Sequence, residues 1–513
     1  MIFTIISVKL KMEEPYAENC ATKAGFFMKT MDPGKNRSKH IAEEIIMAWV
    51  WQFGLAFILS FVVASVLGLA LLKPIINIFT DNFTKRLLKD PYPENLGEMY
   101  NVFAKVGLQN ILEADLRGND GKPLERPFGS PIHFSPWDKL LLNPVYLTRR
   151  PLAESEKVDL QVTIGPQSIR PMQIELPIMI GGMAYGLGPS YQAKIALAKG
   201  ADQVNTATNT GVGPFLPEER KCTKRLIMQY HRGAWGKDEK ILRQANMLEI
   251  QLGYGALGSA PVKLEPQNIS PEFREYMGLS ENEPLTLDAY FPEVKDRSDL
   301  EDLVDYLRKV SGGVPIGVKF GATHRLEAEL DIITGAGVDF ITIDGAEAGI
   351  NFGPTILADS VGLPTLPALS RTVAYLEKKN LQKKVSLIIA GGFVTPGQIL
   401  KALALGADAV YIGTIAMIIL AHLQLTKVIP WEPPTELVYE RGQLKEKFSI
   451  EEGAQNITKF LKSCEAEMMM AMRSLGRKSL SELTRADLCA ISPEVAEFTG
   501  VESGLFRPAR EKS

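Results

Sequence analysis

The sequence predicts an α/β protein whose main part is a closed (β/α)₈ TIM barrel, with a transmembrane helix before it and a helical extension after it. Short apolar runs alternate with helical stretches between Met172 and Leu420, a span close to the roughly 250 residues that such a barrel uses. A long uncharged run, Ile45–Leu72, precedes this region, and the residues after Leu420 show a pattern typical of helices. We therefore divide the chain into an N-terminal segment expected to be poorly ordered (1–44), a transmembrane helix (45–72), a linker and barrel-capping region (73–171), the barrel (172–420) and the C-terminal extension (421–513).

The predicted transmembrane helix runs from Ile45 to Leu72 without a charged residue. A bilayer core needs about 20 apolar residues in a helix, so this run is long enough. Trp49 and Trp51 lie near one end, where amphipathic rings favour the membrane interface. A buried core helix and a cleaved signal peptide are the alternatives, and both normally have a shorter apolar stretch.

Charge and cysteine content exclude several classes of protein. The net charge of the 513 residues is -3 with both signs interspersed, whereas a nucleic-acid-binding protein usually carries a basic stripe. The cysteines, Cys20, Cys222, Cys464 and Cys489, are scattered along the chain. Their spacing fits neither a disulfide framework nor a zinc or iron–sulfur site, so no metal site and no nucleic-acid partner are expected.

Eight candidate strands support the barrel. Near-continuous apolar runs are typical of parallel strands that are covered on both faces. An open doubly wound sheet is the alternative, but the glycines between Gly181 and Gly186 do not match the spacing of its usual fingerprint. The predicted strands are Leu176–Ile180, Gln203–Thr206, Leu226–Tyr230, Met247–Leu252, Pro315–Phe320, Val338–Ile343, Val385–Ala390 and Ala409–Ile412.

The C-terminal extension carries clear helix signals. A helix is expected from Glu451 to Leu475 with Gly476 as its cap, and another should begin at Ser492-Pro493. Ser479 and Glu482 form a capping-box pattern between them.

Glycines follow the two strands that commonly hold phosphate in a barrel. The seventh strand leads into Gly391 and Gly392, and the eighth into Gly413 and Thr414. Backbone N–H groups at these positions can approach a phosphate without a Cβ atom in the way. Tight-turn glycines are the alternative interpretation for each pair alone, but the two pairs together indicate a phosphate cup.

Charged residues follow the fifth and sixth strands. Lys319 ends the fifth strand, and an internal ammonium group is costly unless it meets negative charge. A reduced flavin carries such charge near N1 and O2. The alternative is an ion pair with Asp344 or Glu347, which stand in the acidic, glycine-rich loop after the sixth strand.

Several of these stretches resemble the FMN domain of the glutamate synthase family over roughly 172–417. The loop Gly181-Gly182-Met183-Ala184-Tyr185-Gly186 is similar to the family's GGMSYG, and Asn209-Thr210-Gly211 to its SNTGEGG. Further similar stretches are Val318-Lys319, 341–347, 361–364, 402–410 and 476–483.

The resemblance implies FMN as the cofactor, hydride transfer through flavin N5 and a role near glutamate biosynthesis. Lys319, Asp344, Glu347 and Arg232 are the candidate catalytic residues. The implied FMN contacts are Gly182, Met183, Ala184, Tyr185, Gln229, Lys319, Gly345, Gly391, Gly392, Gly413 and Thr414.

This chain departs from the family pattern in ways that affect electron supply. The family's cysteine cluster should follow the eighth strand, but 416–428 contains no cysteine. No iron–sulfur cluster is therefore expected, and the electron donor stays open.

The residues that read the substrate also depart from the family pattern. Val212 stands where the family has an acidic residue. Leu257 stands where the family has the lysine that meets the 2-oxoglutarate carboxylate. Arg232 either supplies a new positive charge or stacks on Trp235 at the surface. His231 and His324 are either proton donors or ordinary loop histidines.

The sequence therefore favours a membrane-anchored, divergent, FMN-dependent oxidoreductase acting on CH–NH₂ donors, with a small amino- or imino-acid substrate. The charges flanking the apolar run do not decide its orientation. We expect the barrel in the cytoplasm, where electron donors are available, and leave a homo-oligomer open. A membrane-tethered flavin-binding protein without turnover is the alternative function. A 2-hydroxy-acid oxidase is a third, but it would need a His–Arg pair, and the loops after strands six to eight lack histidine.

Overall fold

The computed structural model describes residues 36–91, 95, 97–349 and 353–505. The chain divides into two compact units, the first ending at Asp115 and the second beginning at Leu116. Most of the predicted N-terminal segment 1–44 lies outside the described residues.

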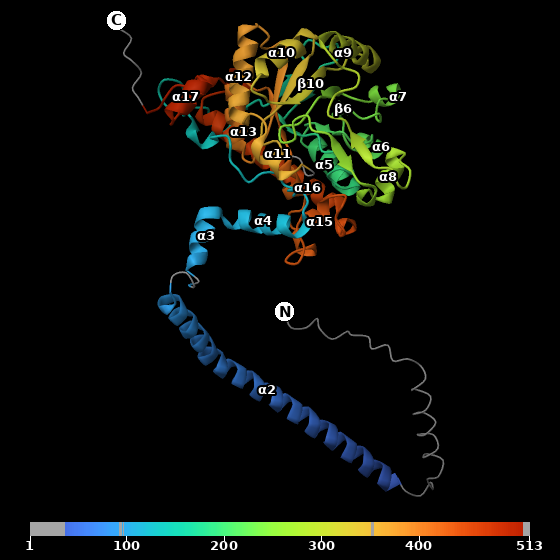
Figure 1. Cartoon of the computed structure of the whole chain (residues 1–513), viewed down its shortest axis with the longest axis vertical. Helices are drawn as coiled ribbons and strands as arrows, with labels where there is room; N and C mark the ends of the chain where they lie inside the picture. The colour runs from blue at the N-terminus through green and yellow to red at the C-terminus, as the bar shows by residue number, and fades with distance from the viewer. Residues whose placement is uncertain (1–35, 92–94, 96, 350–352, 506–513) are drawn as a thin grey trace. The chain divides into compact units, whose positions relative to one another are not determined.

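The first unit is helical. Its main element is α2 (Asn36–Lys89), the long blue helix of Figure 1, which continues beyond both ends of the predicted 45–72. Pro74 lies inside this helix without ending it, and the helix ends just before Asp90-Pro91. From Met47 to Lys89 this helix is, by length and composition, long and apolar enough to cross a membrane. The shorter helices α3 (Glu98–Val106) and α4 (Leu108–Asp120) follow it.

The second unit contains the predicted closed barrel. Its eight strands are all parallel, and the ring β4-β5-β6-β7-β10-β11-β12-β13 closes where β13 pairs with β4. The strands are β4 (Ile178–Ile180), β5 (Thr208–Asn209), β6 (Leu226–Tyr230), β7 (Met247–Gln251), β10 (Ile316–Gly321), β11 (Phe340–Asp344), β12 (Ser386–Ala390) and β13 (Ala409–Ile412).

The predicted second strand was wrong. Gln203–Thr206 forms the turn after the helix α5 (Tyr191–Asp202), because Asn205 adopts a left-handed φ of 53° and the Thr206 hydroxyl donates to the carbonyls of Leu176 and Ile178. The strand begins only at Thr208, which pairs with Ile180.

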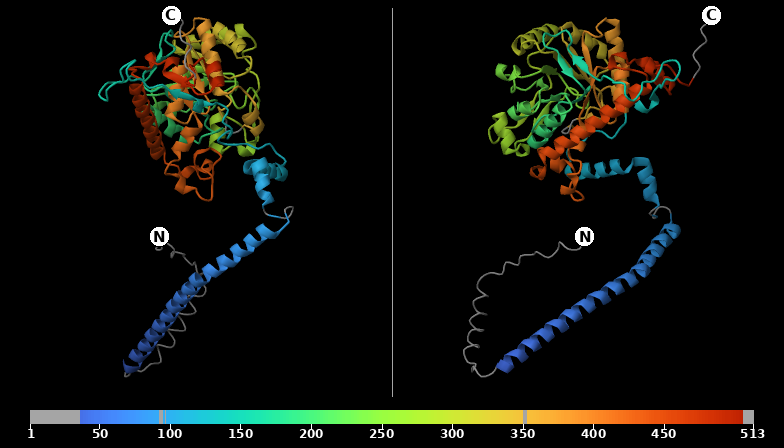
Figure 2. Two further views of the ribbon diagram at one scale, coloured as in Figure 1. Left: turned by 90° about the vertical axis from the view of Figure 1, so that its left-hand side faces the viewer. Right: turned by 180° about the vertical axis from the view of Figure 1, so that it is seen from behind.

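Helices surround the barrel (Figures 1 and 2). The helices that follow its strands are α5 (Tyr191–Asp202), α6 (Pro217–Cys222), α7 (Glu239–Leu242), α9 (Arg297–Ser311), α10 (Leu326–Gly335), α11 (Thr355–Ser360), α12 (Thr365–Lys378), α13 (Pro396–Leu405) and α14 (Thr414–Leu420).

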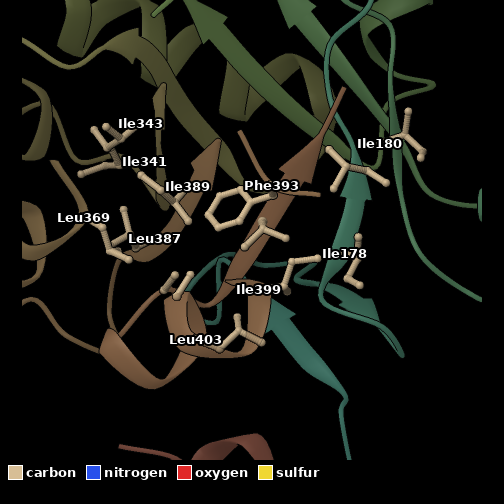
Figure 3. Packing of buried hydrophobic residues seen from close by; sticks show 14 of the residues in the cluster. Ile178, Ile180, Ile341, Ile343, Leu369, Leu387, Ile389, Phe393, Ile399 and Leu403 are labelled. Atoms are coloured by element: carbon tan, nitrogen blue, oxygen red, sulfur yellow. The ribbon is translucent and has the colours of Figure 1, made fainter. Parts of the chain in front are cut away.

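The main hydrophobic core lies between strands and helices. Ile341, Leu387 and Ile389 point outward toward Leu369 of α12 and Leu403 of α13 (Figure 3). The intervening strand residues point into the barrel. Near its N-terminal end they are apolar and form a second cluster with the hairpin β2 (Val162–Ile164) and β3 (Met172–Ile174). Only toward the C-terminal ends of the strands does the interior become polar.

Additional elements decorate the barrel. A hairpin of β8 (Val262–Leu264) and β9 (Leu285–Leu287), with α8 (Pro271–Met277) between its strands, is inserted after β7. The predicted C-terminal helix is α16 (Ile450–Ser474), and Gly476 after it has a φ of 64°. Ser492 caps α17 (Pro493–Thr499), as expected. Ser479 begins only a 3-10 turn, Leu480–Glu482. The remaining elements are β1 (Leu140–Leu142), β14 (Leu488–Ala490) and α15 (Thr435–Val438).

Candidate active site

A cavity opens at the C-terminal ends of the barrel strands. It encloses about 1220 Å³ of space free of protein atoms, part of it open to solvent. Its wall is formed by residues that end β4, β10, β11, β12 and β13, together with Pro127 and Phe128 from the segment before the barrel.

Lys319 and Asp344 form an ion pair in this cavity. Lys319 Nζ lies 3.1 Å from Asp344 Oδ1, and both side chains are buried. Burial lowers the pKa of Lys319, but Asp344 and Glu249 outweigh it and the net shift is upward, so the ammonium group stays charged. The pKa of Asp344 is raised, mainly by burial and further by Glu249, although Lys319 opposes this. The ion-pair alternative for Lys319 is therefore realised with Asp344, and it leaves the ammonium group in the cavity wall.

A buried carboxylate that the sequence analysis did not single out organises the floor. Glu249 of β7 is fully buried. It accepts hydrogen bonds from Asn209 Nδ2 at 2.8 Å, Gln229 Nε2 at 2.7 Å, Thr342 Oγ1 at 2.7 Å and the Tyr411 hydroxyl at 3.1 Å. The signal was available, because a glutamate inside the apolar run Met-Leu-Glu-Ile-Gln must point into the barrel by strand alternation.

The proposed phosphate-binding residues lie together. Gly391, Gly392, Gly413 and Thr414 all line the same cavity, although they come from two separate strand ends. A Cβ atom built on Gly413 would meet no atom within 4 Å, so the space above this backbone is open. This open space would admit a phosphate group above Gly413, and phosphate binding by the four residues stays a prediction.

The first loop of the barrel contributes only part of its predicted contacts. Gly182, Met183 and Ala184 line the cavity. The Tyr185 ring instead packs against Tyr191 and Phe273, with centroids 6.0 and 5.4 Å away, and does not belong to the wall.

Gln229 and Gly345 lie directly behind the wall. A Cβ on Gly182 would approach Gln229 Nε2 to 2.7 Å, and among the described atoms the Gln229 Oε1 has no hydrogen-bond donor. A Cβ on Gly345 would collide with Thr365 Oγ1 at 2.0 Å, so this glycine is required by packing.

The two remaining candidate catalytic residues, Glu347 and Arg232, form hydrogen bonds with other groups of the protein. Glu347 lines the cavity, but it accepts hydrogen bonds from the Ser135 hydroxyl and from Thr365 N at 2.8 Å and Oγ1 at 2.6 Å. Arg232 is buried away from the wall, with Nη1 donating to the Ala289 carbonyl at 3.0 Å, and burial lowers its pKa. It is therefore not the surface arginine of the alternative interpretation, and it is absent from the cavity lining, although its Nε and Nη2 are buried without a hydrogen-bond partner among the described atoms.

The two candidate proton-donating histidines are both absent from the cavity lining. Burial, followed by Lys237 and Arg232, lowers the pKa of His231 to about 3, so its ring is neutral at physiological pH. Its Nδ1 accepts a hydrogen bond from Gly233 N at 3.1 Å. His324 is exposed. Neither is placed to donate a proton in the cavity.

Comparison with known protein families decides the classification. The family model for the conserved region in glutamate synthase matches residues 139–478, which is more than half of the chain. The chain belongs to the glutamate synthase family. This family membership supports an FMN-dependent oxidoreductase, in agreement with the barrel and with the cavity at its C-terminal end.

Individual relatives match different shares of the chain. The chain is 29% identical to a glutamate synthase large subunit-like protein of Rhizobium meliloti, over 71% of this chain and 86% of that protein. It is 34% identical to the archaeal glutamate synthase [NADPH] of Archaeoglobus fulgidus, but over only 48% of each chain.

Among solved structures, a flavocytochrome b2 mutant with pyruvate bound matches with 18% identity and a TM-score of 0.44. That match covers 72% of this chain and 80% of the other. The likeness is too distant to assign a substrate.

Proposed function

We propose that this glutamate synthase family member is a membrane-tethered, FMN-dependent oxidoreductase that acts on a small amino- or imino-acid substrate. The observation that carries the proposal is one cavity in which a buried, charged Lys319 faces the glycine pairs 391–392 and 413–414. When bound, FMN would supply hydride chemistry through N5. The glycine backbones would hold its phosphate, and Lys319 would face negative charge on its ring.

The open polar atoms of the cavity region fit a bound heterocycle. Among the described side chains, Gln229 Oε1 and both amide atoms of Gln251 are buried without a hydrogen-bond partner. Buried polar groups are normally satisfied, so unpaired amides beside a cavity are expected where a ligand completes them. Glu249 holds the Gln229 amide in place from behind.

The cavity chemistry favours a substrate with few negative charges. Val212 lines the wall, and Leu257 is buried among apolar neighbours instead of offering an ammonium group. Among the described lining residues Lys319 is the one cation, and it is already paired with Asp344. A dicarboxylate such as 2-oxoglutarate would therefore lack partners here, because a desolvated carboxylate without a cation is costly.

The electron donor and the location form part of the proposal. Cys222, Cys464 and Cys489 lie on separate elements, α6, α16 and β14, which supports electron uptake without an iron–sulfur cluster. The helix Met47–Lys89 supports a single-pass anchor with the barrel in the cytoplasm. A cleaved signal sequence would leave the mature protein soluble, so its extraction from membranes by alkaline carbonate tests the anchor.

The decisive experiment is a visible spectrum of the detergent-solubilised full chain, followed by reduction trials with NAD(P)H, ferredoxin and a quinol. The reduced protein is then offered imino acids and 2-oxoglutarate with ammonia. We expect a flavin spectrum, reduction by one donor and reoxidation by an imino acid. A colourless protein that fails to bind added FMN would contradict the proposal. Bound flavin without any substrate turnover would favour a flavin-binding protein that is not an enzyme.

A 2-hydroxy-acid oxidase is not favoured by the cavity. Such an enzyme would use a histidine and an arginine beside the flavin, and the described lining contains neither residue type.

A further inference from the structure

The segment that leads from the apolar helix enters the barrel at the cavity. Arg117 Nη2 donates to Thr355 Oγ1 at 2.9 Å, and Thr355 N donates to the Leu124 carbonyl at 2.9 Å. Arg126 forms an ion pair with Asp359 at 2.6 Å. Immediately afterwards the chain reaches the cavity wall. The N-terminal connection is thus fastened to the loops at the C-terminal end of the barrel, the end that holds the candidate active site.

Helix α4, which carries Arg117, also has an apolar side. Leu108, Leu112 and Leu116 of α4 recur every fourth residue and are exposed, as in helices that lie on a membrane surface.

A second segment at the cavity exposes large apolar side chains. Val394 and Ile418 line the cavity and are also exposed, so they mark where it meets solvent. The chain leaves the wall at Ile418 and returns to it at Tyr439, whose hydroxyl donates to the Pro127 carbonyl at 2.9 Å. Between these points Leu423 is 74% exposed and Trp431 is 88% exposed.

We call the exposed residues Val394, Ile418, Leu423, Ile429 and Trp431 the apolar rim; the first two line the cavity, and the other three lie on the segment between its wall residues Ile418 and Tyr439. A group of large exposed apolar residues is typical of an interaction surface. A tryptophan at the edge of such a group is typical of side chains that lie at a membrane interface. The anchor in the same chain makes the bilayer the partner that is always near.

We infer that the apolar rim rests on the bilayer and admits a lipid-soluble quinol, which is the electron donor to the flavin. This inference rests on the proposed function and specifies its donor. Oxidation of the quinol to the quinone breaks its two O–H bonds and releases two electrons and two protons. Both electrons and one proton pass to the oxidised flavin, and the second proton leaves to water. No iron–sulfur cluster is needed for this two-electron exchange.

The test uses the full chain in lipid nanodiscs that contain a long-chain isoprenoid quinol, with bleaching of the visible flavin absorbance as readout. Trp431→Glu and Leu423→Glu should slow bleaching by about tenfold or more, because a charge at the membrane interface is unfavourable. Ile332→Glu on α10, where the native side chain is 44% exposed, is the matched control and should have no effect. Reduction by dithionite should be equal in all four proteins.

A second readout does not depend on flavin. Nanodiscs with brominated lipids quench tryptophans at the bilayer, and Trp431→Phe should remove a measurable part of that quenching while Trp49 and Trp51 supply the rest. Flavin that dithionite reduces but quinol does not would overturn the inference and leave the proposed function standing. Equal quinol rates in every variant, or unchanged quenching in Trp431→Phe, would also overturn it. Protein without flavin would defeat the proposed function, whereas the quenching would still decide whether the rim touches lipid.

Discussion

At the scale of single residues, the cavity floor holds more negative than positive charge. Asp344 and Glu249 both lie near Lys319, and all three side chains are buried. Each carboxylate raises the pKa of the lysine, and Glu249 also raises that of Asp344. Lys319 therefore has two separable effects: it neutralises Asp344, and it presents a positive charge to whatever occupies the cavity.

These two effects can be separated by mutation. Lys319→Met should destabilise the protein by about 3–5 kcal/mol, because it leaves Asp344 buried without its cation. Lys319→Met combined with Asp344→Asn should recover most of that stability but not the affinity for FMN. Thermal unfolding and flavin titration of both variants measure this. Full recovery of FMN binding in the double variant would assign Lys319 to a purely structural ion pair.

Gly413 allows a sharper test of the phosphate cradle. A Cβ at Gly413 meets no atom, but its φ of −127° and ψ of −83° lie outside the regions that residues with a side chain normally adopt, so Gly413→Val should fold with some backbone strain, which thermal unfolding measures. Its side chain should nevertheless occupy the space above the backbone N–H group. Loss of one charge-assisted hydrogen bond is worth roughly 1.5–3 kcal/mol, so FMN should bind at least about tenfold more weakly. Gly397→Ala, which is also sterically free, is the control. Equal FMN affinity in both variants would place the phosphate elsewhere.

At the scale of elements, strand alternation decides which residues face the cavity. Along β10 and β11, Lys319 and Thr342 are paired in register and point inward, while Val318 and Ile341 point to the helices. The same rule directs Glu249 inward from β7. Elements that are not strands contribute differently, because contacts with the loop after β11 and with Tyr439 hold the segment 124–128 at the cavity.

Arg126 holds that segment in place. Its guanidinium contacts both carboxylate oxygens of Asp359, at 2.6 and 2.8 Å, and both side chains are largely shielded from solvent. Arg126→Ala should release residues 122–128 from the cavity wall without unfolding the barrel. Hydrogen exchange should then accelerate in this segment and remain unchanged in β10 and β11. Arg371→Ala, which removes the more exposed ion pair with Glu327, is the control. Unchanged exchange in 122–128 would show that other contacts suffice.

At the scale of the whole molecule, acid stability depends on groups that are buried without charge. His231 has a folded-state pKa of about 3, against an ordinary value of 6.5. The unfolded chain therefore binds the proton more readily, and the stability that His231 contributes is complete above pH 6.5 and is lost as the pH falls toward 3.

His231→Asn should flatten this dependence, since an asparagine oxygen can accept the Gly233 N–H and does not titrate. The wild type should lose roughly 3–5 kcal/mol more than the variant between neutral pH and pH 3, less where relaxation admits water. Melting temperatures measured in parallel from pH 7 to pH 4 check this. Parallel curves for the two proteins would show that His231 is not buried as a neutral ring.

The sequence by itself determined the elements and their class. Apolar runs that end in glycine marked the parallel strands, and the long uncharged run marked α2, because burial on two faces and burial in lipid both demand continuous apolar residues. Motifs at 181–186 and 341–347 determined the family. The sequence also predicted that the glycines after the seventh and eighth strands lie close together, because the C-terminal ends of all strands meet at one end of a closed barrel.

Only the tertiary structure decided which of these residues share the cavity. In the structure Lys319 forms an ion pair with Asp344, and Glu347 accepts hydrogen bonds from Ser135 and Thr365. Tyr185 and Arg232 are buried in the protein and do not line the cavity. The structure also revealed Glu249 as the organiser of the floor and fastened 124–128 beside the opening. The physical reason is that hydrogen bonds and ion pairs join residues from distant strands, and their choice among several possible partners depends on register and packing that no local pattern contains.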